Sequence, residues 1–267
     1  MTNGKKLLLC AALLTALFLL AGCSREAEQP AERAAAPAAQ PAAPAVDPAT
    51  AATITGKVLY KDGQPQRTRL RMDADAACSR LHSSAVYAQD VVLNDNGTLR
   101  YAFVYVKEGP GNRAFPAPKE PVTLDQKGCM YEPHVAGIVV NQELHILNSD
   151  PTTHNVHPVP STNREWNQSQ PPGTDKLVQS FAREEMAIPV KCNIHPWMRS
   201  YIHVMKHPFF AVTGPDGSFE IKGLPPGDYT IAAWQEKFGT VEQKLTVGAK
   251  ESKAIEFSFS PTVGGGD

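Results

Sequence analysis

The chain has 267 residues, of which 42% are hydrophobic and 20% are charged, and its formal net charge is −1 at pH 7. Such an even balance of charges argues against a nucleic-acid-binding protein and against attachment to membranes through a basic surface. Only five cysteines are present, so each can be considered in turn.

Residues 1–22 have the pattern of an export signal. Lys5 and Lys6 form a basic start, and residues 7–20 are apolar but too short for a comfortable membrane span. The Leu-Ala-Gly-Cys sequence that ends at Cys23 resembles the lipobox of bacterial lipoproteins. This resemblance implies cleavage before Cys23, acylation of its thiol, and an exported chain that lipid anchors to a membrane facing the periplasm or the cell surface. An ordinary signal peptide with an incidental cysteine is the alternative.

Residues 23–52 are rich in Ala, Pro, Glu and Gln. With almost no large apolar side chain, this segment cannot offset the entropy lost on ordering, so it predicts a disordered tether.

The chain beyond the tether is predicted to be all-β. Residues 54–60 alternate in polarity, residues 95–97 (Asp-Asn-Gly) are a strong hairpin signal, and residues 100–106 are almost entirely apolar or aromatic. Outside the signal no helical period extends much beyond about ten residues. Residues 73–82 are compatible with one short helix.

Two segments further along carry side chains that bind soft metals. Cys192, His195 and Met198 follow one another with the spacing Cys-x2-His-x2-Met, and His154 offers a second imidazole upstream. Soft sulfur with imidazole selects copper over hard cations, and two His with one Cys and a weak axial Met form a blue copper site. That geometry suits both Cu(I) and Cu(II). We therefore expect one type 1 copper per chain and a carrier of single electrons.

The sequence CNIHPWMR at residues 192–199 closely resembles the ligand loop of the amicyanins, a family of small cupredoxins. The segment His-Asn-Val-His at 154–157 resembles the other half of that site. The resemblance covers about residues 120 to 207 and implies a Greek-key cupredoxin β-sandwich at 116–207. It implies that Asn155 braces the cysteine-bearing strand through hydrogen bonds. The copper ligands that it implies are His154, Cys192, His195 and Met198.

Four other histidines are candidates for the surroundings of the site or for a second metal. His157 is expected near the site without binding the metal, and His134 is expected to be neutral and structural. His203 and His207 are expected to be surface or interface groups. If some of the four formed a type 2 centre, the protein would be a copper enzyme instead.

Trp197 stands between two predicted ligands. Core packing would explain it, but we expect it to border an exposed edge of His195, where a redox partner docks. A c-type cytochrome or a periplasmic oxidoreductase is the expected partner. The chain has no Ser-His-Asp order, paired catalytic carboxylates or nucleotide loop, which favours a carrier over an enzyme.

The C-terminal part has short strands separated by turns at residues 214–217 and 223–227. This pattern resembles the second half of a carboxypeptidase regulatory-like domain, which is a transthyretin-type β-sandwich. In a rival interpretation of the function, this sandwich binds carbohydrate or protein and the protein only sequesters copper. A first half that fits begins at Gly56. We therefore predict a discontinuous sandwich made of residues 53–115 plus 208–260, followed by a disordered tail at 261–267. In the rival arrangement, residues 53–120 elaborate the cupredoxin domain.

Cys78 and Cys129 are the cysteines that remain after the signal, the lipid and the metal are assigned. In an exported chain disulfides persist, so we expect a bridge between them. Two buried thiols, or one further metal ligand, are the alternatives.

Overall fold

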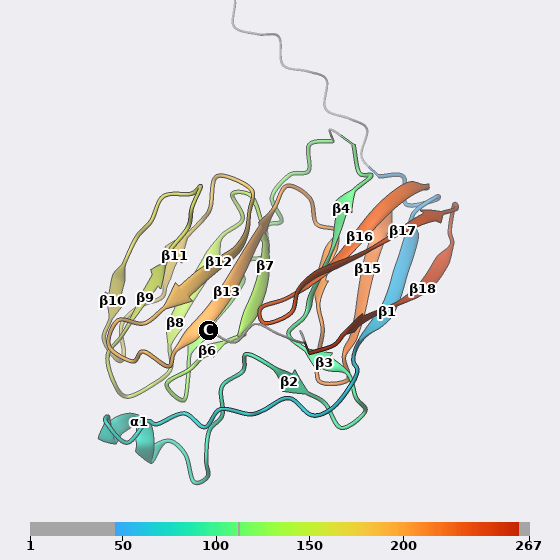
Figure 1. Cartoon of the computed structure of the whole chain (residues 1–267). Helices are drawn as coiled ribbons and strands as arrows, with labels where there is room; N and C mark the ends of the chain where they lie inside the picture. The colour runs from blue at the N-terminus through green and yellow to red at the C-terminus, as the bar shows by residue number, and fades with distance from the viewer. Residues whose placement is uncertain (1–45, 112, 262–267) are drawn as a thin grey trace, which may run out of the picture. The chain divides into compact units, whose positions relative to one another are not determined.

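The structure is a computed structural model that describes residues 46–111 and 113–261. The predicted signal with Cys23, most of the predicted tether and nearly all of the predicted tail lie outside the described residues. The described part contains strands β1 to β18 and one short helix, α1 (Ala76–Arg80), so the all-β prediction is confirmed (Figure 1). No helix among these residues is long and apolar enough to cross a membrane.

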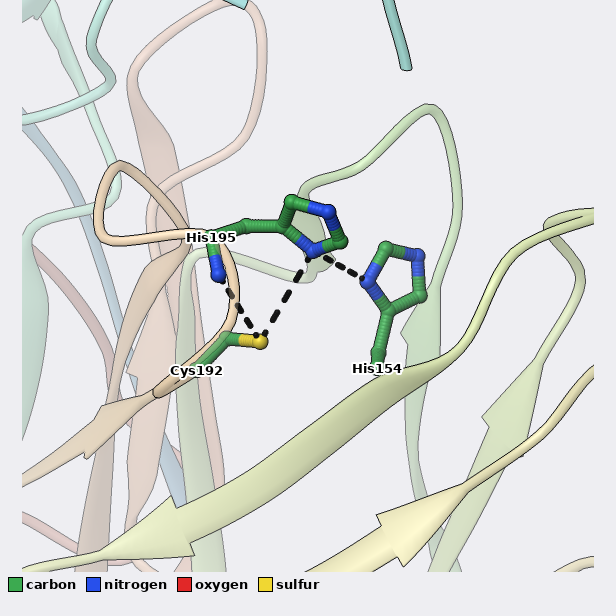
Figure 2. Close-up of side chains that lie close together, drawn as sticks. All are labelled: His154, Cys192 and His195. Atoms are coloured by element: carbon green, nitrogen blue, oxygen red, sulfur yellow. Dashed lines mark hydrogen bonds between the residues drawn. The ribbon is translucent and has the colours of Figure 1, made fainter. Parts of the chain in front are cut away.

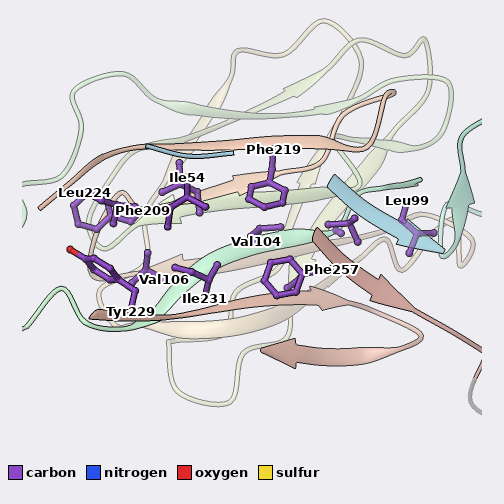
Figure 3. Packing of buried hydrophobic residues seen from close by; sticks show 14 of the residues in the cluster. Ile54, Leu99, Val104, Val106, Phe209, Phe219, Leu224, Tyr229, Ile231 and Phe257 are labelled. Carbon is purple, nitrogen blue, oxygen red and sulfur yellow. The ribbon is translucent and has the colours of Figure 1, made fainter. Parts of the chain in front are cut away.

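The first sandwich has two sheets, with strand orders β15-β1-β18 and β14-β4-β16-β17. Its strands are β1 (Ala52–Tyr60), β4 (Phe103–Glu108), β14 (Phe210–Val212), β15 (Ser218–Leu224), β16 (Gly227–Gln235), β17 (Gly239–Val247) and β18 (Ser252–Phe259). Figure 3 shows side chains from both sheets meeting in its core, among them Ile54, Val104, Ile231 and Phe257. A small hairpin of β2 (Val92–Leu93) and β3 (Leu99–Arg100) encloses the predicted Asp-Asn-Gly turn.

Strand β1 shows how the alternating sequence makes this sandwich. Ile54 and Val58 are fully buried, whereas Lys57 between them is exposed, because successive side chains of a strand point to opposite faces. A Cβ at Gly56 would collide with the carbonyl oxygen of Ile255 in β18, so a glycine lets the two strands approach.

The second sandwich has sheets with strand orders β10-β9-β12-β13-β7 and β11-β8-β5-β6. Its strands are β5 (Val122–Gln126), β6 (Tyr131–Glu132), β7 (Val135–Val139), β8 (Leu144–Asn148), β9 (His154–Pro158), β10 (Gln168–Gln170), β11 (Leu177–Gln179), β12 (Glu185–Lys191) and β13 (Arg199–Met205). Its core includes Leu124, Ile146, Ile188 and Ile202, and it also contains Cys192 and Met198.

Strands β1 and β4 pair with strands of residues 210–259, since β1 lies between β15 and β18, and β4 lies between β14 and β16. The strands of residues 122–205 pair among themselves. A relationship of the first sandwich to transthyretin-like domains stays a prediction.

The contact between the sandwiches is aromatic. The ring of His203 in β13 stacks on Phe103 of β4 at a centroid distance of 4.0 Å, and it meets Trp234 of β16 edge-on at 4.5 Å. His203 is fully buried there, and His207 is buried against Phe209. Neither histidine is therefore a surface group, and of the two expected alternatives His203 takes the interface position, between the sandwiches.

One long excursion leaves the first sandwich between β1 and β2. Its two arms are joined by backbone hydrogen bonds from Leu70 to Val86 and from Ala88 to Thr68. We call residues 68–88 the strap. Helix α1, at its tip, begins because the N-cap Asp75 accepts hydrogen bonds from the backbone N–H groups of Ala77 and Cys78.

Candidate metal centre

Three neighbouring strands bring the predicted ligands together. Strand β9 starts with His154 and pairs with β12, and β12 pairs with β13. The loop that joins β12 to β13 contains Cys192, His195 and Met198. Because β12 and β9 run antiparallel, the loop that follows β12 lies beside the start of β9. Figure 2 shows the three side chains converging from these two places.

The donor atoms lie close together and away from solvent. Nδ1 of His154 and Nδ1 of His195 are 2.9 Å apart, and Sγ of Cys192 lies 3.9 Å from Nδ1 of His195. One ligand atom from each residue lies within 4.8 Å of the others, and none of the three residues is more than 3% exposed. Met198 is fully buried in the same hydrophobic cluster as Cys192.

The two imidazoles are oriented as ligands by carboxylates. Nε2 of His154 lies 2.8 Å from Asp150, and Nε2 of His195 lies 3.2 Å from Asp75. When both outer nitrogens donate to carboxylates, the inner Nδ1 atoms direct their lone pairs at each other. A proton or a metal cation must then lie between them. Carboxylate-supported imidazoles of this kind are typical of metal sites.

The chemistry of the donors fits copper. Two other groups of possible ligands include Cys78 or Cys129, but their sulfurs form a disulfide and cannot supply a thiolate. The remaining group offers one free thiol and two imidazoles, a soft set that suits copper.

The charges of the site prepare the thiol for binding. Burial opposes ionisation of Cys192, but hydrogen bonds from His154 and from nearby backbone N–H groups outweigh it and lower the pKa of Cys192 to about 6. Burial also opposes protonation of His154, but hydrogen bonds to Asp150 and Cys192 raise its pKa to about 9. Without metal, the site therefore holds a thiolate beside an imidazolium near neutral pH.

Asn155 joins β9 to the ligand loop. Its Oδ1 accepts a hydrogen bond from the backbone N–H of Asn193 at 2.7 Å and lies 3.3 Å from Sγ of Cys192. Its Nδ2 donates to Asn167, and the hydroxyl of Tyr131 donates to its backbone oxygen. These contacts hold the cysteine in place from the neighbouring strand.

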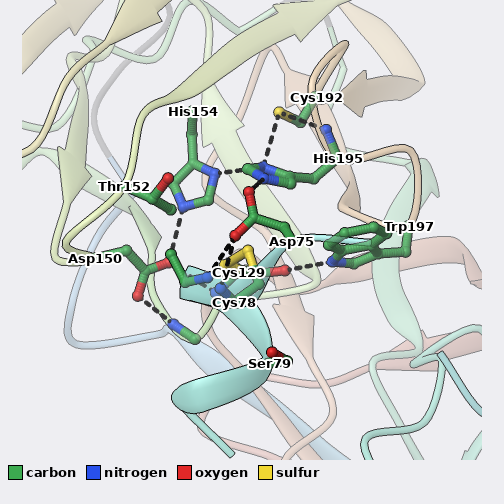
Figure 4. Close-up of a disulfide and its surroundings, with 12 residues drawn as sticks. Asp75, Cys78, Ser79, Cys129, Asp150, Thr152, His154, Cys192, His195 and Trp197 are labelled. Carbon is green, nitrogen blue, oxygen red and sulfur yellow. Dashed lines mark hydrogen bonds and ion pairs between the residues drawn. A yellow bond between two sulfur atoms is a disulfide. The ribbon is translucent and has the colours of Figure 1, made fainter. Parts of the chain in front are cut away.

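A disulfide connects the two supporting carboxylates. Cys78 of the strap is bonded to Cys129, whose backbone N–H donates to Asp150 at 2.7 Å. Figure 4 shows the result: Asp75 and Asp150 lie on either side of the bridge, and each holds one imidazole. Sequence reasoning missed both carboxylates. Asp150 precedes His154 by four residues, which was a usable signal, whereas nothing local linked Asp75 to the site.

His195 has no exposed edge, so the prediction that Trp197 borders one is wrong. His195 is only 2% exposed, because Asp75 lies against its outer nitrogen. The half-buried ring of Trp197 lies 5.1 Å from that of His195, and its Nε1 donates to the backbone oxygen of Cys129.

The remaining histidines lie apart from this group. His134 bridges the backbone oxygen of Arg199 and the carboxylate of Glu236. His157 contacts Asn193 and Glu165 at the edge of the ligand loop. Of the possible metal-binding groups found in residues 46–111 and 113–261, none contains His134, His157, His203 or His207.

No family model and no curated protein match the chain. Among solved structures, it is similar to a copper-containing nitrite reductase from Thermus scotoductus, with 21% identity and a TM-score of 0.30 over 35% of this chain and 24% of that one. A purple cupredoxin from Nitrosopumilus maritimus has 19% identity and a TM-score of 0.27, covering 31% and 98%. A variant of amicyanin in its Cu(I) form has 19% identity and a TM-score of 0.27, covering 38% and 97%. The chain thus spans about a quarter of the length of the nitrite reductase.

Proposed function

We propose that the chain is a cupredoxin that binds one type 1 copper and carries single electrons. The observation that supports this most is the convergence of two Nδ1 atoms and one Sγ atom in a buried site, within 4.8 Å of one another. His154, Cys192 and His195 would hold the metal, and Met198 in the same loop would supply the weak axial thioether.

The chain's own residues prepare this site before the metal arrives. Cys192 is already inclined to ionise, and Asp150 and Asp75 fix the two imidazoles with Nδ1 turned inward. Burial keeps water from the ligands. His154 lies on strand β9, and the other ligands lie in the short loop between β12 and β13. Bound copper would supply a one-electron couple, and a fixed ligand set keeps rearrangement small when the electron moves.

The cellular setting is part of the proposal. Acylation of Cys23 would anchor the exported chain to a membrane facing the periplasm or the cell surface, and a c-type cytochrome or a periplasmic oxidoreductase would exchange electrons with it. The lipobox-like sequence supports the anchor, and the one-electron site supports a partner of this kind.

Simple measurements distinguish electron transfer from two other possible functions. A copper enzyme with a type 2 centre requires a second copper per chain, and a copper-sequestering module requires no reversible redox chemistry. Among the described residues, no group of possible ligands contains His134, His157, His203 or His207, which favours the carrier.

The test is to load the purified chain with copper and measure metal content, visible spectrum and voltammetry. We expect one copper per chain, an intense thiolate-to-copper band and a reversible one-electron wave. Cys192→Ser should lose the band, because a hydroxyl cannot replace the thiolate, while wild-type protein stripped of copper and reloaded should regain it. A band that survives in Cys192→Ser would overturn the assignment. Two coppers per chain would favour the enzyme, and an irreversible wave would favour sequestration.

A further inference from the structure

We infer that the strap is the docking surface of this protein and that it fits an acidic redox partner. The inference rests on the proposed electron-carrier function and specifies the kind of partner for it. The exchange moves one electron between the reduced site and the oxidised centre of the partner, with no transfer of a proton or an atom.

The strap lies over the outer edge of His195. Asp75, at the start of α1, contacts Nε2 of His195, and the imidazole is almost completely buried. A partner that approaches this side of the site therefore meets the strap before it meets the imidazole. The hydrogen bond between Asp75 and His195 also gives the electron a short connection from the ligand to the strap.

The strap is fastened to the second sandwich at three points. Asp75 holds His195, Cys78 is bonded to Cys129, and Nε2 of His82 lies 2.8 Å from the backbone oxygen of Gly128. A surface fixed in this way can be presented to a partner without being reordered, which lowers the cost of association.

The charge of the strap is positive although the whole chain is slightly negative. Arg69, Arg71 and Arg80 are exposed on it, and Arg67 lies just before it. The carboxylate of Asp75 already contacts Nε2 of His195 and the backbone N–H groups at the start of α1. Of the ion pairs found among the described residues, the arginines take part in one, a 3.8 Å contact between exposed Arg71 and Asp73, and such pairs are weak. The arginines thus remain available to a negatively charged partner.

The two arms of the strap line an open hollow of about 810 Å³. Its lining combines Arg69 and Arg71 with the carboxylate of Asp73 and the hydroxyls of Ser79, Ser83 and Ser84. Guanidinium groups with neighbouring hydroxyls match the carboxylates of acidic side chains in geometry and in charge.

Apolar surface accompanies the charge. Leu81, at the end of α1, is 39% exposed, and Ile194, next to His195 in the ligand loop, is 50% exposed. Only one other large hydrophobic residue, Val178, is comparably exposed in the described part of the chain. Apolar contacts among charged ones are the usual composition of a specific interface.

The surface can be mapped without any electron transfer. Hexacyanochromate(III), a paramagnetic and redox-inert anion, should broaden amide signals of the strap in NMR spectra of the metal-free protein. The double variant Arg69→Glu with Arg71→Glu should lose this broadening. The control, Lys222→Glu with Lys244→Glu, makes the same change of net charge on exposed lysines of the first sandwich and should keep it. Broadening centred elsewhere would overturn the inference.

The nature of the partner is tested with two c-type cytochromes, one acidic and one basic, and copper-loaded protein. The acidic cytochrome should react faster at low salt and lose its advantage as salt rises, because screening removes the attraction. The strap variant should slow that reaction by about tenfold or more, and the lysine control should not. Equal rates with both cytochromes, or an equal effect of both variants, would overturn the inference. Failure to bind copper or to exchange electrons at all would reject the carrier function, and the NMR map would still decide whether the strap attracts anions.

Discussion

The carboxylate of Asp75 lies 3.2 Å from Nε2 of His195, although the two residues are 120 positions apart in the chain. One oxygen of Asp75 caps helix α1, and the other supports the imidazole. The same carboxylate therefore starts helix α1 of the strap and orients the imidazole of His195, a proposed metal ligand. The order of the strap and the geometry of the site are linked through this contact.

Removal of this support should weaken copper binding without unfolding the strap. In Asp75→Asn the amide can still cap α1, since Asn is a good N-cap, but it loses the charge that holds His195. We expect a loss of about 10- to 100-fold in copper affinity, measured by competition with a chelator. Asp73→Asn is the control, because Asp73 is exposed and contacts only Arg71 among the ion pairs described. Equal affinities in the two variants would show that Asp75 does not orient the ligand.

Loss of the disulfide should cost both stability and order. The bridge spans 51 residues, and its removal in Cys78→Ser with Cys129→Ser should lower the free energy of unfolding by about 4 kcal/mol. Denaturant unfolding measures this loss. Hydrogen exchange at α1 should also rise sharply, because the helix would then be held only by Asp75 and His82. Unchanged protection of α1 would mean that the bridge is dispensable for the strap.

The proposed role of Met198 as a weak fourth ligand can be tested separately from the other three ligands. Met198→Gln should keep copper, because the thioether is the weak ligand of such a set. The reduction potential should fall, since an oxygen donor is harder than sulfur and favours Cu(II). Voltammetry measures the shift. Complete loss of copper would show that Met198 is indispensable to the site.

The buried His203 should make the protein sensitive to acid. Burial lowers its pKa from 6.5 to about 3, so below pH 6.5 the unfolded chain binds a proton that the folded chain refuses. Stability should therefore fall as the pH falls from 6.5 to about 3, by about 1.4 kcal/mol for each pH unit. In His203→Gln this part of the slope should vanish, because the amide does not titrate but can still accept from Ala187 as His203 does. Urea unfolding at several pH values measures how stability depends on pH. The same slope in the wild type and in His203→Gln would show that His203 does not cause the sensitivity to acid.

Local sequence predicts the ligands better than it predicts their surroundings. Three of the four proposed ligands lie within seven consecutive residues, 192–198. Their spacing is therefore enough to predict a metal site. The all-β class follows from alternation such as that of β1. The burial of His195 does not follow, because it depends on where the strap returns to the second sandwich. The sequence allows a short helix at residues 73–82, where α1 lies, but nothing in it says which part of the protein this helix contacts. Only the three-dimensional structure brings Asp75 to His195.

The pH dependence of copper binding provides the last prediction. In the metal-free site the pKa of Cys192 is about 6 and that of His154 is about 9, so between these values the site is a thiolate beside an imidazolium. Copper must displace the proton of His154 in that range, and affinity should rise by about tenfold for each pH unit. Below about pH 6 the thiol is protonated as well, so the dependence should steepen toward two protons. Above about pH 9 both ligands are free of protons, and the affinity should level off. Chelator competition across this range, with calorimetric counting of released protons, tests the scheme. An affinity that is independent of pH between 6 and 9 would show that no imidazolium stands between the two Nδ1 atoms.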